Sequence, residues 1–258
     1  MKIAATILLC VLAVSAHARD ITVAAAADLR AVLDEISARY RAETSVQIKV
    51  VYGSSGNLYQ QIQNGAPFDL FFSANSDYPK KLETAGLIVP RSYYEYARGS
   101  IVLFVASNSA LNLQEGLPVL LDASIKRIAI ADPAHAPYGR AAIAVLKSQG
   151  LYDRVSGKIV VGENVAQAAS FVTSGAADVG IIARSLAMLP SARSQSRFAE
   201  IPANEYPPII QACVALKSSK IQTAANRFLS YVRGPEASKI LQRYGFEIPA
   251  TQAKQPLQ

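Results

Sequence analysis

The sequence predicts an α/β protein with two lobes, each a mainly parallel sheet flanked by helices. Over residues 20–86, apolar and β-branched runs alternate with amphipathic segments in the order β-α-β-α-β-α. The same alternation returns between residues 100 and 200. Strands that alternate with helices favour parallel sheets covered by helices on both faces. A return strand and two closing helices after residue 208 then predict that the second lobe is inserted into the first.

The first lobe is expected to begin with a buried strand at 21–27, after which Asp28 is the expected N-cap of a helix. Apolar residues recur on one face of that helix at the 3.6-residue period, namely Leu29, Val32, Leu33, Ile36 and Tyr40. Further strands are expected at 46–52 and 69–73, and further helices from Ser55 and over 76–85.

The second lobe and the return to the first follow the same rules. Strands are expected at 101–106, 127–131, 158–161, 177–182 and 209–216, and helices at 138–148, 164–174, 223–233 and 236–244, with helical turns at 118–121 and near Ser185. The predicted division is 19–99 plus 209–250 for the first lobe and 100–208 for the second. Chain crossings near 98–100 and 207–209 would form a two-strand hinge, which a ligand touching both lobes would close.

Both ends of the chain are expected to lie outside this fold. Residues 1–18 have the pattern of a secretory signal peptide, with Lys2, an apolar stretch and a small-x-small cleavage site at 16–18. The apolar stretch is shorter than the roughly 20 residues that span a bilayer. We therefore expect an exported, periplasmic protein that begins near Arg19. Residues 251–258 are polar and aperiodic, which predicts a flexible tail.

Composition excludes several classes of function. Without residues 1–18 the chain has 25 Lys and Arg against 19 Asp and Glu, and these charges are spread along the sequence. Nucleic-acid binding would need clustered basic residues with interleaved aromatics, and the sequence has no such cluster. Cys213 and His135 are then the single cysteine and the single histidine, which excludes an internal disulfide and a histidine-rich metal site. Cys213 is expected to be a buried apolar residue.

The turn at 53–56 is the strongest candidate for a binding site. A strand ends there and a helix begins at once, so backbone N–H groups without intrahelical partners and the positive end of the helix dipole are exposed. Ser54 and Ser55 add hydroxyl donors. Ligands of such sheets lie beyond the carboxyl ends of the strands, where the helices near Asp28, Tyr138 and Asn164 also begin. A Ser-Ser-Gly turn before a helix is most often only an N-cap, whereas four converging helix starts favour a small oxyanion.

Several segments, in this order and spacing, resemble the periplasmic molybdate-binding proteins, the substrate-binding components of molybdate ABC importers. The matching stretches are 21–29, Tyr52-Gly53-Ser54-Ser55-Gly56, the Gly-Ala-Pro-x-Asp pattern of 65–69, Asp132-Pro133-x-His135-x-Pro137-x-Gly139, Glu163-Asn164-Val165, 179–181 and 234–246. The resemblance implies the type II periplasmic binding protein fold. It also implies capture of molybdate, and of tungstate, for a permease in the inner membrane, with a monomer expected and no cofactor.

The resemblance also implies a ligand set of neutral donors, with no cationic side chain. Carried over by position, Asp28, Ser55 and Tyr138 bind the anion together with the N–H of Val165, and Ala27 and Ser54 are further candidates. Molybdenum enters this site only as molybdate, whose oxygen atoms those residues contact.

Two positions depart from the family pattern. Many members have Ser or Asn where this chain has Asp28, and an ionised carboxylate cannot donate to a dianion. We expect its N–H to bind while the carboxylate turns back to cap the helix. Ala183 stands where some members place a ligand-binding tyrosine, and Tyr138 is expected to supply that hydroxyl instead.

Three alternatives stay open at this point. The first is a receptor for another oxyanion, namely sulfate, phosphate or chromate. The second is a receptor for an amino acid, which would use Asp28 and Arg140, or for iron. The third is an exported serine hydrolase with Ser55 and His135, although Asn57 stands where a Gly-x-Ser-x-Gly turn needs glycine. His135 is expected to be structural.

Overall fold

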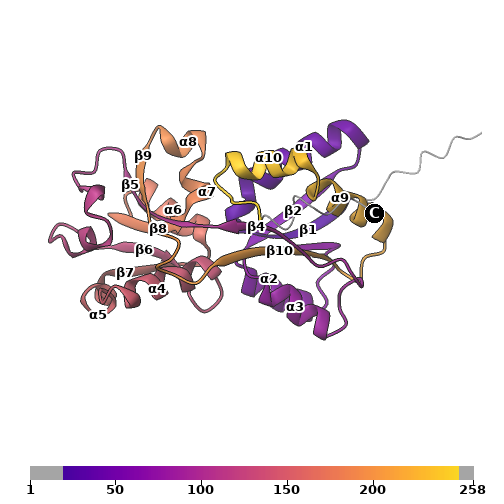
Figure 1. Cartoon of the computed structure of the whole chain (residues 1–258), viewed down its shortest axis with the longest axis horizontal. Coiled ribbons are helices and arrows are strands. Elements are labelled where there is room, and N and C mark those ends of the chain that lie inside the picture. The colour runs from indigo at the N-terminus through magenta and orange to yellow at the C-terminus, as the bar shows by residue number, and fades with distance from the viewer. Residues whose placement is uncertain (1–19, 250–258) are drawn as a thin grey trace, which may run out of the picture.

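The structure, a computed structural model, describes residues 20–249 as two five-stranded sheets, each flanked by helices (Figure 1). The predicted signal peptide and flexible tail lie outside these described residues. The α/β architecture of two mainly parallel sheets is confirmed. No helix within 20–249 combines the length and apolar character needed to cross a membrane.

The first sheet has the strand order β2-β1-β3-β10-β4. Its strands are β1 (Ile21–Ala26), β2 (Ile48–Gly53), β3 (Leu70–Ser73), β4 (Tyr94–Gly99) and β10 (Ile209–Ala215). β1 pairs in parallel with both β2 and β3, in a register that sets Ala26 beside Gly53. β10 is antiparallel to both of its neighbours. The loops after β1 and β2 therefore leave the same edge of the sheet.

The second sheet repeats this plan in the order β7-β6-β8-β5-β9. Its strands are β5 (Ile101–Ala106), β6 (Ile128–Ala131), β7 (Ile159–Gly162), β8 (Val179–Ala183) and β9 (Ser196–Glu200). β6 is parallel to β7 and β8, and β5 is antiparallel to β8 and β9.

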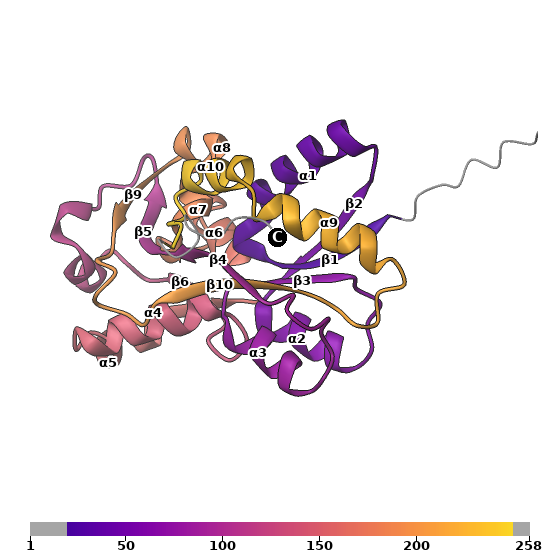
Figure 2. The same cartoon turned by 45° about the vertical axis from the view of Figure 1, so that its right-hand side comes forward.

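One strand in each sheet runs against the rest, and each is the strand that directly follows a crossing from the other sheet: β5 in the second sheet and β10 in the first. The chain passes from β4 to β5 through Ser100 alone, and from β9 to β10 through 201–208. In Figures 1 and 2, β4 and β10 run side by side through the middle of the molecule. Two adjacent connections of this kind form the predicted hinge, and we propose the lobe division 19–99 plus 209–250 and 100–208.

Helices cover both faces of the two sheets (Figure 2). The α-helices are α1 (Arg30–Thr44), α2 (Ser55–Gln63), α3 (Asp77–Thr84), α4 (Pro137–Ser148), α5 (Tyr152–Val155), α6 (Val165–Thr173), α7 (Arg184–Ala187), α8 (Pro190–Arg193), α9 (Gln222–Val232) and α10 (Pro235–Arg243). Short 3-10 turns are η1 (Ala27–Leu29), η2 (Leu113–Glu115), η3 (Leu117–Leu121) and η4 (Ser156–Lys158). The five residues predicted to form the apolar face of the first helix are all buried, and so is Cys213.

The start of the first helix differs from the prediction. The chain leaves β1 through the 3-10 turn η1, in which Asp28 is the central residue, and α1 begins only at Arg30. The N-cap positions of η1 and α1 are held by Ala26 and Leu29, and neither makes a side-chain cap bond. Asp28 is thus not an N-cap. Its side chain is free to face the other lobe.

Candidate functional site

A small cavity lies between the two lobes, where β1 and β2 end and where α2, α4 and α6 begin. The space in it that the centre of a water molecule can occupy amounts to about 10 Å³. It is lined by Ala26, Ala27, Asp28, Gly53, Ser54, Ser55, Ala74, Ala136, Pro137, Tyr138, Asn164 and Val165. All six residues predicted to bind a ligand are in this set. Topology therefore brings together loops that lie more than 130 positions apart in the chain.

Helix starts face the cavity from both lobes. Ser55 is the first residue of α2 and Val165 is the first residue of α6. N–H groups in the first turn of a helix have no acceptor within the helix. The side chain of Asn164 caps α6 by accepting from Ala166 and Gln167 at 3.0 and 3.1 Å, and leaves the N–H of Val165 for another acceptor.

The two serines of the α2 turn are both buried. The Ser55 Oγ accepts a hydrogen bond of 2.9 Å from the backbone N–H of Ala74, so its hydroxyl proton is available to a second group. The Ser54 Oγ is buried without any hydrogen-bond partner among the described residues. A buried hydroxyl without a partner is unfavourable, which makes this turn a candidate for contact with a ligand.

The carboxylate of Asp28 does not cap a helix, so that expectation is wrong. Asp28 is 2% exposed, and its Oδ2 accepts from the Tyr138 hydroxyl at 2.8 Å and from the Gln211 Nε2 at 2.6 Å. These partners lie 110 and 183 positions away. The Oδ1 atom is buried and has no partner within 20–249. The capping prediction failed because two distant donors outcompete the local N–H groups.

Burial makes the ionised form of the Asp28 carboxyl group unfavourable. Desolvation raises the pKa of this carboxyl from 3.8 to about 6, and the hydrogen bonds from Tyr138 and Gln211 only partly offset it. The pKa of Tyr138 is raised well above 10, first by burial and then by the negative charge of Asp28 beside it. Tyr138 is therefore a hydrogen-bond donor at neutral pH, and in this structure its proton goes to Asp28.

Tyr138 is held in place by the chain crossing. It is the second residue of α4, which begins with Pro137 at a position that tolerates proline. Gly99, the last residue of β4, passes so close that an added Cβ would overlap with the Tyr138 hydroxyl. The Gln211 Nε2 lies 3.1 Å from the same hydroxyl, and the Tyr96 hydroxyl donates to the Gln211 Oε1 at 2.9 Å. Sequence reasoning missed Gln211 and Gly99, because strand residues give no local signal of a contact across the hinge.

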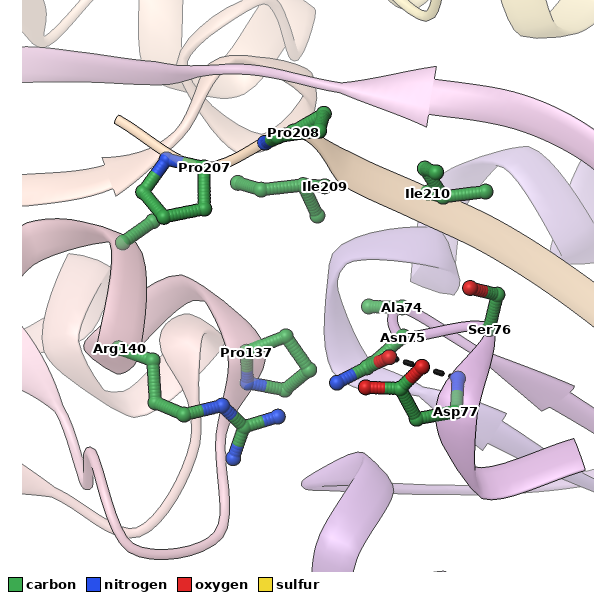
Figure 3. Close-up of a pocket in the computed structure, with 11 residues that line it drawn as sticks. Ala74, Asn75, Ser76, Asp77, Pro137, Arg140, Pro207, Pro208, Ile209 and Ile210 are labelled. Atoms are coloured by element: carbon green, nitrogen blue, oxygen red, sulfur yellow. Dashed lines mark hydrogen bonds between the residues drawn. The ribbon is translucent and has the colours of Figure 1, made fainter. Parts of the chain in front are cut away.

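Basic side chains do not line the cavity. Arg140 lies in a neighbouring interlobe crevice, where Figure 3 shows its guanidinium on the opposite side from Asn75 and Asp77. Its Nη1 donates to the Tyr78 hydroxyl at 3.3 Å. The crevice shares Ala74 and Pro137 with the cavity, so the two are adjacent. Within 20–249 there is also no cluster of acidic, His and Cys side chains that could hold a metal ion.

His135 contributes to the lobe contact through its backbone. Its carbonyl accepts from the N–H of Gly56 at 2.9 Å, so the loop before α4 rests on the first turn of α2. Ser55 and the His135 side chain share no hydrogen bond among the described residues. A nucleophile–base pair, which a serine hydrolase would need, is therefore not assembled here.

A family model described as bacterial extracellular solute-binding protein matches residues 21–247. The chain belongs to this solute-binding family. It is 35% identical to the molybdate-binding protein ModA of Azotobacter vinelandii over 235 residues, covering 91% of this chain and 92% of that protein. The ModA protein of Rhodobacter capsulatus is 36% identical over 235 residues, with 91% of each chain covered.

The fold of this solute-binding protein has a solved counterpart. The periplasmic molybdate-binding protein of Azotobacter vinelandii superposes with a TM-score of 0.84 at 35% identity. The match covers 89% of this chain and 100% of that one. The matched family and these relatives are described as solute-binding proteins.

Proposed function

We propose that this protein captures molybdate in the interlobe cavity and delivers it to an ABC importer. The observation that carries the proposal is the set of neutral donors that meet there: the N–H groups at the starts of α2 and α6, and the hydroxyls of Ser54 and Ser55. Relatives at 35% and 36% identity that bind molybdate support the choice of anion.

Neutral donors suit a dianion that must be released again. Each N–H or O–H compensates part of the hydration that the anion loses, and the helix dipoles add a favourable potential at their N-termini. A buried cation would bind sulfate, phosphate and molybdate alike by charge. A cavity of fixed donors instead selects by size, and tungstate matches molybdate closely, so we propose that both bind.

The cellular setting follows from the same proposal. Residues 1–18 would direct export into the periplasm, and a permease in the inner membrane would receive the anion from both lobes. A monomer is the form in which each lobe stays accessible to that permease. The protein itself carries out no chemical conversion.

Isothermal titration calorimetry with the exported form, residues 19–258, tests the proposal. Molybdate and tungstate are expected to bind tightly, and sulfate, phosphate and chromate weakly or not at all. Ser170→Ala is the control for serine variants in the cavity such as Ser55→Ala. Because the Ser170 hydroxyl lies on the exposed face of α6, this control should bind molybdate normally. Sulfate or phosphate binding that equals molybdate binding would disprove the anion assignment. An esterase assay with no turnover separates the receptor from a serine hydrolase.

A further inference from the structure

The two oxygens of the Asp28 carboxylate have different surroundings. Oδ2 already accepts from the Tyr138 hydroxyl and from the Gln211 amide, at 2.8 and 2.6 Å. Oδ1 is buried and without a partner among the described residues, and its residue lines the cavity. A buried carboxylate oxygen without a donor is unfavourable, so its position calls for a group on the ligand that shares a proton with it.

We propose that one proton lies between Asp28 Oδ1 and an oxygen of the bound oxyanion, so that capture of molybdate takes up one proton from solvent. This rests on the proposed function. An ionised Asp28 would set a negative charge against a dianion in a site that lacks cationic side chains. A proton on Oδ1 turns that repulsion into an O–H···O⁻ hydrogen bond, the strong charge-assisted kind. The only bond formed is this O–H bond, and water or buffer supplies the proton.

Asp28 is the group in the cavity that is suited to take the proton. Tyr138 from α4 and Tyr96 from β4 face it, but both are already protonated because burial raises their pKa well above 10. The thiol of Cys213, farther along β10, is protonated as well, since burial raises its pKa to about 12. Burial raises the pKa of Asp28 itself to about 6, and a dianion beside it would raise that pKa further.

The nearby cations are engaged elsewhere. The Arg30 guanidinium, two positions along the chain, stacks on the Tyr52 ring at 4.5 Å. Arg184 of α7 pairs with Glu200 at 2.7 Å and donates to the carbonyl of Gly245 at 3.2 Å. The contact of α7 with the Asp28 turn is made by the Ser185 hydroxyl, which donates to the Asp28 carbonyl at 2.9 Å. No described cation therefore neutralises this carboxylate in place of a proton.

The shared proton has a consequence for selectivity. Molybdate is fully deprotonated at neutral pH and must obtain the proton from solvent. Hydrogen phosphate brings its own proton and can donate it to an ionised Oδ1. Asp28 thus makes the preference between the two anions depend on pH, with molybdate favoured more strongly as the pH falls.

Calorimetry at pH 7 and pH 8, in two buffers with different heats of ionisation, measures the proton directly. The unmodified chain is expected to take up about one proton per molybdate, and its Kd for molybdate should rise about tenfold from pH 7 to pH 8 by linkage. Asp28→Asn supplies an amide donor in place of the O–H. It should bind molybdate with no proton uptake and with the same Kd at both pH values. Asp153→Asn, on the exposed surface of α5, should behave like the unmodified chain.

The outcomes separate this proposal from the one it rests on. Molybdate binding without proton uptake, and with a constant Kd, overturns the shared proton and leaves the receptor function intact. Uptake that persists in Asp28→Asn assigns the proton to another group and also overturns it. Absence of molybdate binding by the unmodified chain at both pH values would instead disprove the proposed function. Proton uptake on molybdate binding is measured with the unmodified chain alone. The shared proton can therefore be disproved even if Asp28→Asn folds poorly.

Discussion

Tyr138, at the start of α4, donates its hydroxyl proton to the carboxylate of Asp28, in the turn η1 that follows β1, over 2.8 Å. The bond joins the two lobes inside the cavity. Gln211 of β10 donates to the same carboxylate oxygen, and Tyr96 of β4 donates to Gln211. Strand β10 therefore contacts the pair directly and β4 is linked to it through Gln211, so the geometry of the cavity and the position of the hinge depend on one another.

The buried carboxylate of Asp28 should make stability depend on pH. Its pKa is about 6 in the folded protein against an ordinary 3.8. The folded state thus holds the proton more tightly, and the associated stability is fully present below about pH 4 and lost as the pH rises through 6. Two pKa units correspond to about 3 kcal/mol. The unfolding free energy of Asp28→Asn minus that of the unmodified chain should therefore be larger at pH 7.5 than at pH 4, by up to about 3 kcal/mol.

Urea denaturation of the anion-free protein at the two pH values measures this change. Asp153→Asn serves as the control, because its carboxylate is exposed. If the difference between the Asp28→Asn and unmodified chains were the same at pH 4 and pH 7.5, the pKa of Asp28 would not be raised.

The Ser55 hydroxyl should contribute directly to anion binding. Its Oγ accepts from the Ala74 N–H, which leaves its proton for the anion. Removal of a hydrogen bond to a charged group costs about 1.5–3 kcal/mol, so Ser55→Ala should raise the Kd for molybdate by roughly ten- to hundredfold. The variant also leaves the Ala74 N–H without its acceptor, and a thermal melt must accompany the titration. A folded Ser55→Ala that binds molybdate normally would remove Ser55 from the site.

The sequence predicted the arrangement of the site better than the orientation of its side chains. Helix starts and strand ends are local features, and the alternating order then fixes which loops share an edge. This is why the helix starts near Ser55, Tyr138 and Asn164 could be placed together, while the resemblance to molybdate-binding proteins implied which residues bind. The direction of the Asp28 carboxylate depends on Gln211, 183 positions away, and no local pattern encodes that contact.

Two strands were missed for a related reason. β4 contains Glu95 and Arg98, and β9 contains Arg197 and Glu200, so neither shows the apolar run of a buried strand. Both lie at the edge of their sheet, where charged residues are tolerated and help to prevent further pairing. Their positions follow from the hinge connections rather than from hydrophobic pattern.

Gly56 should be required for the lobes to meet. Its N–H donates to the His135 carbonyl, and an added Cβ would lie 2.8 Å from that carbonyl oxygen and 2.8 Å from the Tyr78 hydroxyl. Gly56→Ala should therefore hold the lobes apart and weaken molybdate binding by tenfold or more. Small-angle scattering would detect the change, because molybdate should no longer reduce the radius of gyration. Gly157→Ala, where an added Cβ meets nothing within 4 Å, is the matched control.

Gly99 offers a separate test of the link between hinge and cavity. It closes β4 opposite Ile209 of β10, immediately before the chain crosses at Ser100. A methyl group there would overlap with the Tyr138 hydroxyl, so Gly99→Ala should push Tyr138 away from Asp28. The loss of a buried donor to a carboxylate predicts a further rise in the Asp28 pKa and weaker molybdate binding, again by about tenfold. Calorimetric titration of Gly99→Ala with molybdate, with Gly157→Ala as the control, measures the change in Kd. An unchanged Kd would show that the hinge strand does not position Tyr138.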